Sequence, residues 1–184
     1  MSDIDRIIAE KTMRLQADMA KKGRHLSFSI NLSAKDLEDE KLLFFIHSKI
    51  IETGAHPNYL IFEVTETAAV HDINRVVKFI SAMKGLGCRF ALDDFGVGFT
   101  SFLYLQQMQV DYIKIDGAFV RRMNENTNDQ LFVRAMTGVA KGLGIKTIAE
   151  FVENEEILNM LKEFGVDYAQ GYAVGKPRPE LLDR

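Results

Sequence analysis

Short stretches rich in β-branched and aromatic residues alternate along the chain with longer stretches of helical period. The short stretches predict six strands, at Leu26–Asn31, Tyr59–Val64, Cys88–Asp94, Val110–Asp116, Ile145–Glu150 and Val166–Gln170. The longer stretches predict amphipathic helices at Leu42–Thr53, Ile73–Leu86, Gln130–Leu143 and Glu155–Phe164, with a shorter one at Ser101–Met108. Strands that alternate with helices are typical of βα units paired in a parallel sheet.

An amphipathic helix is predicted to open the chain. Its apolar residues share one side, namely Ile4, Ile7, Ile8, Leu15 and Met19.

The predicted strands carry apolar residues on one face and polar residues on the other. In Tyr112–Asp116 the isoleucines share one face, and Lys114 and Asp116 share the opposite face. Strands buried in an open parallel sheet would be apolar on both faces. A (β/α)₈ barrel explains the asymmetry, because one strand face packs on the helices and the other points inward.

The strand count falls short of a full barrel. Such a barrel has eight strands and typically about 250 residues, whereas this chain of 184 residues predicts six strands. We therefore expect a modified (β/α)₈ TIM-type barrel of the α/β class that lacks about two N-terminal βα units. Residues 1–184 would form one partial domain, with 1–22 as the helix after the missing second strand and 26–176 as the remaining βα units.

Composition and charge indicate which partners and which cellular compartment suit the chain. The net charge is −3 and no run of Lys or Arg occurs, which argues against a surface for a nucleic-acid polymer. The single cysteine, Cys88, cannot form an internal disulfide and favours a reducing cytoplasm; it is interpreted as a core residue. No apolar run approaches the ~20 residues of a membrane segment, although the parent protein could be anchored elsewhere.

Polar side chains gather where the predicted strands end. These candidates are Asn31, Glu63, Asp93, Asp94, Lys114, Asp116, Glu150 and Gln170. Carboxylates brought together repel one another, and one lysine cannot neutralise five of them. The set therefore predicts bound cations, and ligation by oxygen alone favours Mg²⁺ or Mn²⁺. Two such ions are typical of phosphoester hydrolysis.

Simpler interpretations remain open for single residues. Glu66 and Glu153 stand near helix starts, where acids stabilise the helix. Lys114 and Asp116 could form an ion pair within a barrel layer. Asn31 and Gln170 could bond loop backbone. The adjacent pair Asp93-Asp94 is harder to explain by folding alone.

Six motifs, in order along nearly the whole chain, resemble those of EAL domains. They are Ser29-Ile30-Asn31-Leu32-Ser33, Phe62-Glu63-Val64-Thr65-Glu66, Leu92-Asp93-Asp94-Phe95-Gly96-Val97-Gly98, Tyr112-Ile113-Lys114-Ile115-Asp116, Ile148-Ala149-Glu150-Phe151-Val152-Glu153 and Gln170-Gly171-Tyr172. The resemblance implies a modified (β/α)₈ barrel. It also implies hydrolysis of cyclic-di-GMP to linear pGpG with Mg²⁺ or Mn²⁺.

The resemblance assigns a role to each candidate. One metal would be held by Asn31, Glu63 and Asp93, and Asp93 would bridge to a second metal held with Asp94 and Glu150. Catalytic roles would fall to Lys114, Asp116, Glu150 and Gln170, with Lys114 contacting the attacking water or the phosphate. Glu66 would stabilise the loop Asp93–Phe99, and Glu153 would lie on the substrate side.

The chain departs from the family pattern in one important respect. It contains no Glu-Ala-Leu motif, whose glutamate supplies a further ligand to the first metal. The first metal site is therefore expected to be incomplete and this chain inactive on its own. Phe151 also stands where a glycine is usual.

Three interpretations of function remain. The parent could be an active phosphodiesterase, a degenerate domain that binds or senses cyclic-di-GMP or serves in dimerisation, or a short protein that serves as an interaction surface. Open strand edges predict a homodimer or swapped oligomer. Sensor or GGDEF-type domains are possible companions in the parent chain.

Overall fold

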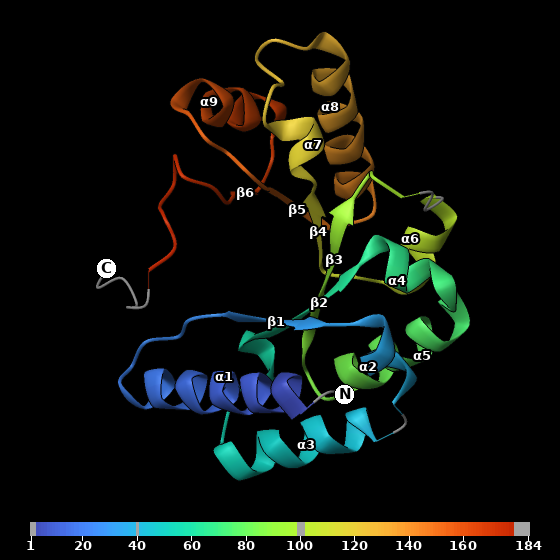
Figure 1. Ribbon diagram of the computed structural model, residues 1–184, viewed down its shortest axis with the longest axis vertical. Helices are drawn as coiled ribbons and strands as arrows, with labels where there is room; N and C mark the ends of the chain where they lie inside the picture. The colour runs from blue at the N-terminus through green and yellow to red at the C-terminus, as the bar shows by residue number, and fades with distance from the viewer. Residues whose placement is uncertain (1–2, 40, 99–101, 179–184) are drawn as a thin grey trace. The chain divides into compact units, whose positions relative to one another are not determined.

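The computed structural model describes residues 3–39, 41–98 and 102–178 (Figure 1). They form an α/β fold of six parallel strands with flanking helices, and the strands follow the order β1-β2-β3-β4-β5-β6. The predicted fold class and the six strands are thereby confirmed. The chain divides into a first unit, Met1–Asp93 with Gly98–Tyr112, and a second unit, Asp94–Val97 with Ile113–Arg184.

The first unit holds three strands in long parallel register. Five successive residue pairs join β1 to β2, from Phe28↔Leu60 to Leu32↔Val64, and five join β2 to β3. Its elements are α1 (Asp3–Lys21), β1 (Phe28–Leu32), α2 (Ala34–Glu38), α3 (Leu42–Thr53), a 3₁₀ turn (Pro57–Tyr59), β2 (Leu60–Thr65), α4 (Glu66–His71), α5 (Ile73–Gly85), β3 (Arg89–Phe95), whose last two residues belong to the second unit, and α6 (Phe102–Met108).

The core of the first unit forms where β2 and β3 meet α5. Phe62 and Phe90 are fully buried neighbours with ring centroids 5.9 Å apart, and Phe79 meets Phe90 edge to face. Cys88 lies beside this core as a free, buried thiol. Burial raises the pKa of that thiol to about 12, because the charged thiolate loses its hydration.

Helix α1 buries a different side from the apolar one predicted. Ile4, Ile7 and Ile8 are 68%, 53% and 51% exposed, and Leu15 is exposed as well. The buried side consists of Ala9, Met13, Gln16, Ala17 and Met19. Small side chains allow α1 to lie close against β1 and α3 (Figure 1). Of the residues predicted to share the apolar side, Met19 alone packs inward.

The second unit uses much shorter strands. Its elements are β4 (Tyr112–Ile115), whose first residue belongs to the first unit, α7 (Gly117–Val120), α8 (Thr127–Gly142), β5 (Lys146–Ala149), α9 (Glu155–Phe164) and β6 (Tyr168–Ala169). Backbone bonds beyond the strands continue the pairing. Glu150 N donates to Ile115 O at 3.1 Å, and Gln170 N donates to Ala149 O at 2.8 Å.

Helix boundaries follow the sequence signals closely. Helices α3 and α9 have the predicted bounds, and each ends at a left-handed glycine, Gly54 and Gly165. The short helices α2, α4 and α7 were not predicted. Ser101, the predicted start of α6, lies outside the described residues. No described helix has the length and apolar content needed to cross a membrane.

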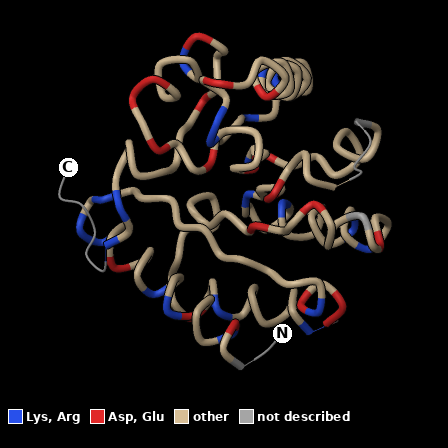
Figure 2. The backbone as a smooth tube through the Cα atoms, turned by 45° about the horizontal axis from the view of Figure 1, so that its top comes forward, with Lys and Arg blue, Asp and Glu red and all other residues tan. Residues whose placement is uncertain are grey.

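Basic residues (Lys and Arg) and acidic residues (Asp and Glu) are interspersed along the backbone (Figure 2).

Candidate functional site

Lys114 and Glu150 form a buried ion pair in the second unit. Lys114 lies on β4 and Glu150 follows β5 directly, with Lys114 Nζ 2.9 Å from Glu150 Oε1. The two side chains are 7% and 10% exposed. Burying a charge is costly unless it is paired, so each charge keeps the other in place.

Asp116 serves the backbone at the start of α7. Its Oδ1 accepts a hydrogen bond from Ala118 N at 2.6 Å, as an N-cap residue does. The sequence left open an ion pair between Lys114 and Asp116, and the structure places Lys114 in an ion pair with Glu150. Asp116 is half-buried, so a structural role for it is now visible beside the proposed catalytic one.

Asp94 and Glu150 come close enough to share a cation. Each offers a carboxylate oxygen, and these oxygens lie within 4.8 Å of one another. Asp94 is exposed, and its backbone adopts a φ of 54°, a left-handed conformation that aspartate tolerates better than most residues. Glu150 has a second carboxylate oxygen besides the one paired with Lys114. Carboxylate oxygens of this kind fit the preference of Mg²⁺ or Mn²⁺.

The three candidates of the first unit share one face of its strands. Asn31 and Glu63 are direct partners in the register of β1 and β2, and Glu63 pairs with Ala91 of β3. Asp93 follows Ala91 by two residues and therefore points to the same face. Glu63 is buried, whereas Asn31 is exposed. The predicted first metal group thus gathers within the first unit, at the carboxyl ends of its strands.

Glu66 binds the backbone of a distant loop. It is 2% exposed, and its Oε2 accepts a hydrogen bond from Gly98 N at 2.9 Å. A Cβ at Gly98 would lie 2.8 Å from the Glu66 carboxylate carbon, so the contact depends on glycine there. The adjacent Thr65 caps α4 through its own side chain. Of the loop predicted to be stabilised, Phe99 lies outside the described residues.

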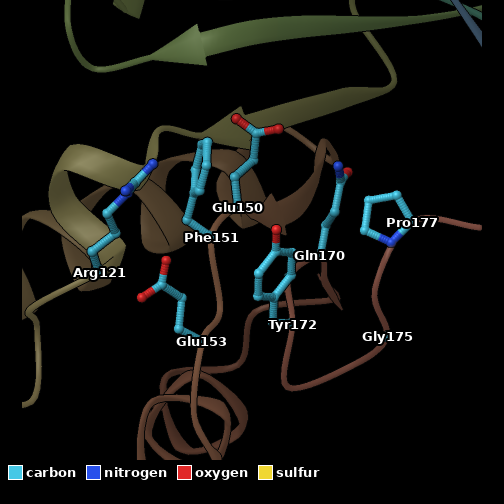
Figure 3. A pocket seen from close by; sticks show the side chains of 9 residues that line it. Arg121, Glu150, Phe151, Glu153, Gln170, Tyr172, Gly175 and Pro177 are labelled. Atoms are coloured by element: carbon cyan, nitrogen blue, oxygen red, sulfur yellow. The ribbon is translucent and has the colours of Figure 1, made fainter.

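A pocket of about 420 Å³ opens in the second unit beside Glu150 (Figure 3). Two of its lining residues, Gln170 and Gly171, take part in a tight backbone crossing with Val152, where Val152 N donates to Gln170 O at 3.0 Å. A Cβ at Gly171 would lie 2.3 Å from both Val152 N and Val152 O, so the crossing requires glycine. The lining residues are Arg121, Glu150, Phe151, Glu153, Gln170, Gly171, Tyr172, Gly175 and Pro177.

This pocket gathers three predicted site residues and one that sequence reasoning missed. Glu150, Glu153 and Gln170 were expected near substrate, whereas Arg121 was not singled out. For Phe151, which also lines the pocket, a signal existed in Gly117, because a glycine directly after a strand and its cap leaves room for another side chain. The Phe151 ring fills that room, since a Cβ at Gly117 would lie 2.3 Å from Phe151 Cδ2.

Comparison with known proteins agrees with these motifs. The family model for the EAL domain matches residues 1–177. The cyclic di-GMP phosphodiesterase PdeB of Shewanella oneidensis is 38% identical over 97% of this chain and 21% of its own length. The cyclic di-GMP phosphodiesterase PdeA of Borreliella burgdorferi is 33% identical over 96% of this chain and 26% of its own length. This chain therefore spans about a fifth to a quarter of these curated relatives.

Solved structures agree as well. The structure described as the PaMucR phosphodiesterase in complex with c-di-GMP matches 96% of this chain and 72% of its own, with a TM-score of 0.92 and 27% identity. The FimX EAL domain from Pseudomonas aeruginosa bound to c-di-GMP matches 95% of this chain and 69% of its own, with a TM-score of 0.87 and 26% identity. The chain belongs to the EAL domain family.

Proposed function

We propose that this chain binds cyclic-di-GMP and belongs to a metal-dependent phosphodiesterase that hydrolyses it to linear pGpG. The observation that carries the proposal is the buried Lys114–Glu150 pair, with Asp94 close to Glu150, in a chain of this family. A buried lysine beside a carboxylate and a further acid is an arrangement suited to a phosphate group, whose negative charge the ammonium stabilises.

Each candidate residue has a role in this proposal. Asp94 and Glu150 would hold one Mg²⁺ or Mn²⁺, and Asn31, Glu63 and Asp93 would contribute to another. Such ions stabilise charge on phosphoryl oxygens and lower the pKa of a bound water. Lys114 orients the attacking water or a phosphate oxygen through its ammonium donors. Asp116 and Gln170 bond the water, Glu153 contacts the substrate, and Glu66 holds the backbone at Gly98.

Because this chain contains no Glu-Ala-Leu motif and is expected to be inactive on its own, hydrolysis is tested on the full-length parent protein, by incubation with cyclic-di-GMP and Mn²⁺ followed by chromatography for pGpG. The E150Q variant should lose at least about 100-fold in rate, since a charged group in contact with the reacting centre is removed. E163Q makes the same change at an exposed position of α9 and should leave the rate unchanged. Product formation that E150Q does not reduce contradicts this account.

Binding without hydrolysis is the second candidate. It is favoured by the sequence, which contains no Glu-Ala-Leu triplet. Calorimetry that shows cyclic-di-GMP binding, together with no pGpG in the assay above, would establish it. Absence of both binding and product would contradict both candidates.

We also propose that the chain self-associates. Strands β1 and β6 lie at the two ends of the strand order, and an edge strand offers unpaired backbone groups to another chain. Light scattering that shows a monomer alone at high concentration would contradict this. The proposed setting is the cytoplasm, supported by a single cysteine that is free and buried. Sensor or GGDEF-type domains would accompany the chain in a parent of the length of its relatives.

A further inference from the structure

Arg121 and Phe151 form one wall of the pocket in the second unit. The guanidinium carbon of Arg121 lies 3.8 Å from the centroid of the Phe151 ring, which is contact distance for a cation–π pair. Phe151 is 44% exposed although it is a large apolar residue. In Figure 3, Arg121 lies on one side of the Phe151 ring, and Gln170 and Tyr172 lie on the other.

The conformation of Phe151 is unusual and is held by packing. Its φ is 53°, in the left-handed region that bulky residues rarely adopt. The ring fits against Gly117, where any Cβ would lie within 3.0 Å of three Phe151 atoms. Strained backbone of this kind persists where surrounding structure enforces it, and it is concentrated at functional sites. The ring is thus fixed in position at the pocket edge.

The cation behind the ring has no competing charge partner in the part of the chain that the structure describes. Across residues 3–39, 41–98 and 102–178, Arg121 forms its interaction with Phe151 and no ion pair with a carboxylate. Arg121 therefore acts through the ring. It covers one ring face and leaves the other turned toward the pocket.

We propose that the free face of Phe151 stacks a guanine base of the nucleotide, with Arg121 as the positioning residue behind it. The proposal rests on the proposed function and concerns ligand selectivity at the same site. Aromatic side chains that stack bases are common in nucleotide recognition. Glu153 lines the same pocket, and its carboxylate can accept hydrogen bonds only; the Watson–Crick edge of guanine presents N1–H and N2–H₂ donors.

Calorimetry of the full chain with cyclic-di-GMP tests the stack. F151L keeps an apolar side chain and loses the ring, so binding should weaken about 10-fold to 100-fold. F151Y retains the ring and should bind within about 3-fold of the unmodified chain. F151G suits the φ of 53°, so it remains folded on backbone grounds and should weaken binding as F151L does. R121M should weaken binding about 2-fold to 5-fold.

The pair Arg134–Phe164 supplies a matched control. Its guanidinium carbon lies 4.2 Å from the ring centroid, and neither residue lines the pocket. F164L and R134M should leave binding unchanged. E153Q should lower the preference for cyclic-di-GMP over cyclic-di-AMP, a change that a purely structural role of this wall would not produce.

The outcomes separate this inference from the proposed function. If the unmodified chain does not bind cyclic-di-GMP, both fail. If it binds and neither F151L nor F151G weakens binding, the inference that Phe151 stacks a guanine base is wrong, and the proposed function stands. A loss in F151L that F151Y restores supports the wall.

Discussion

The two units arrange their polar residues in different ways. In the first unit, Asn31, Glu63 and Asp93 share a face because three strands run in register over five residue pairs each. In the second unit, β5 and β6 are four and two residues long, and Glu150 and Gln170 come after the strands end. Regular pairing positions the first set, and individual backbone contacts position the second.

Left-handed backbone at residues other than glycine occurs in both units: Gln109 of the first unit has a φ of 52°, but it is not a candidate site residue. In the second unit, Asp94 and Phe151, which are not glycines, have φ values of 54° and 53°. Both adjoin residues of the candidate site. A site built on irregular backbone depends on a few close contacts, so single substitutions there should have larger effects than comparable substitutions in the first unit.

The largest effect is expected from breaking the buried ion pair of the second unit. K114M removes the ammonium group that pairs with the buried Glu150 carboxylate, and loss of one partner of a buried pair costs about 3–5 kcal/mol of unfolding free energy. Urea unfolding measures the loss.

The matched change in the first unit is K84M. Lys84 Nζ lies 2.9 Å from Asp111 Oδ1, the same separation as in the buried pair, with side chains 33% and 28% exposed. Partial exposure screens the charges, so K84M should cost at most about 1 kcal/mol. Equal losses in K114M and K84M would contradict the contrast between the units.

A smaller loss is expected from G171A, which places a Cβ 2.3 Å from backbone atoms of Val152. Backbone atoms cannot turn aside, so the crossing must open, at a cost of about 2–3 kcal/mol in unfolding free energy. G175A is the control, because nothing lies within 4 Å of the Cβ position there. Thermal unfolding of the two variants in parallel gives the comparison, and equal melting temperatures would refute it.

G98A is the counterpart in the first unit and should have a milder effect. The new Cβ would meet the carboxylate end of Glu66 at 2.8 Å, and a side-chain end can shift where backbone cannot. We expect a loss of about 1 kcal/mol as the hydrogen bond from Gly98 weakens. A loss in G98A greater than in G171A would reverse the proposed distinction.

The smallest effect concerns pH and the charges that join α1 to α3. Hydrogen bonds from Arg14 and Lys49 lower the pKa of Glu10 below 4.5, and Lys49 does the same for Glu52. A carboxyl whose pKa is lower in the folded state stabilises the fold above its unfolded pKa. This contribution is lost as the pH falls through the lowered value.

The melting temperature should therefore decrease slightly more on acidification below pH 4.5 in the unmodified chain than in K49Q. K141Q, an exposed change in α8, should follow the unmodified chain. Identical acid profiles for K49Q and the unmodified chain would show that these exposed pairs contribute nothing measurable.

The sequence anticipated the strands and the long helices well. Six strands, the bounds of α3 and α9, and the gathering of Asn31 with Glu63 follow from local period and from parallel pairing. These features depend on residues close in sequence or on strand register, and the pattern of apolar and polar residues predicts both.

Other features depend on tertiary packing, which the pattern of apolar and polar residues in the sequence does not specify. The apolar pattern of α1 does not identify its buried side, because the isoleucines are exposed and the helix packs through a side that includes alanines, whose small size allows close packing. The sequence left open an ion pair between Lys114 and Asp116, two residues away, whereas the structure pairs Lys114 with Glu150, which directly follows β5. The wall of Arg121 and Phe151 depends on backbone angles that no local pattern specifies.

The fit of Phe151 over Gly117 has a consequence for how such sequences can diverge. A side chain at position 117 and a ring at position 151 exclude one another, because a Cβ at 117 would lie 2.3 Å from the ring. A lineage that exchanges Phe151 for glycine first opens the space, and residue 117 can then vary. The reverse order passes through a clash. The two positions are therefore expected to change together in descent, with position 151 changing first.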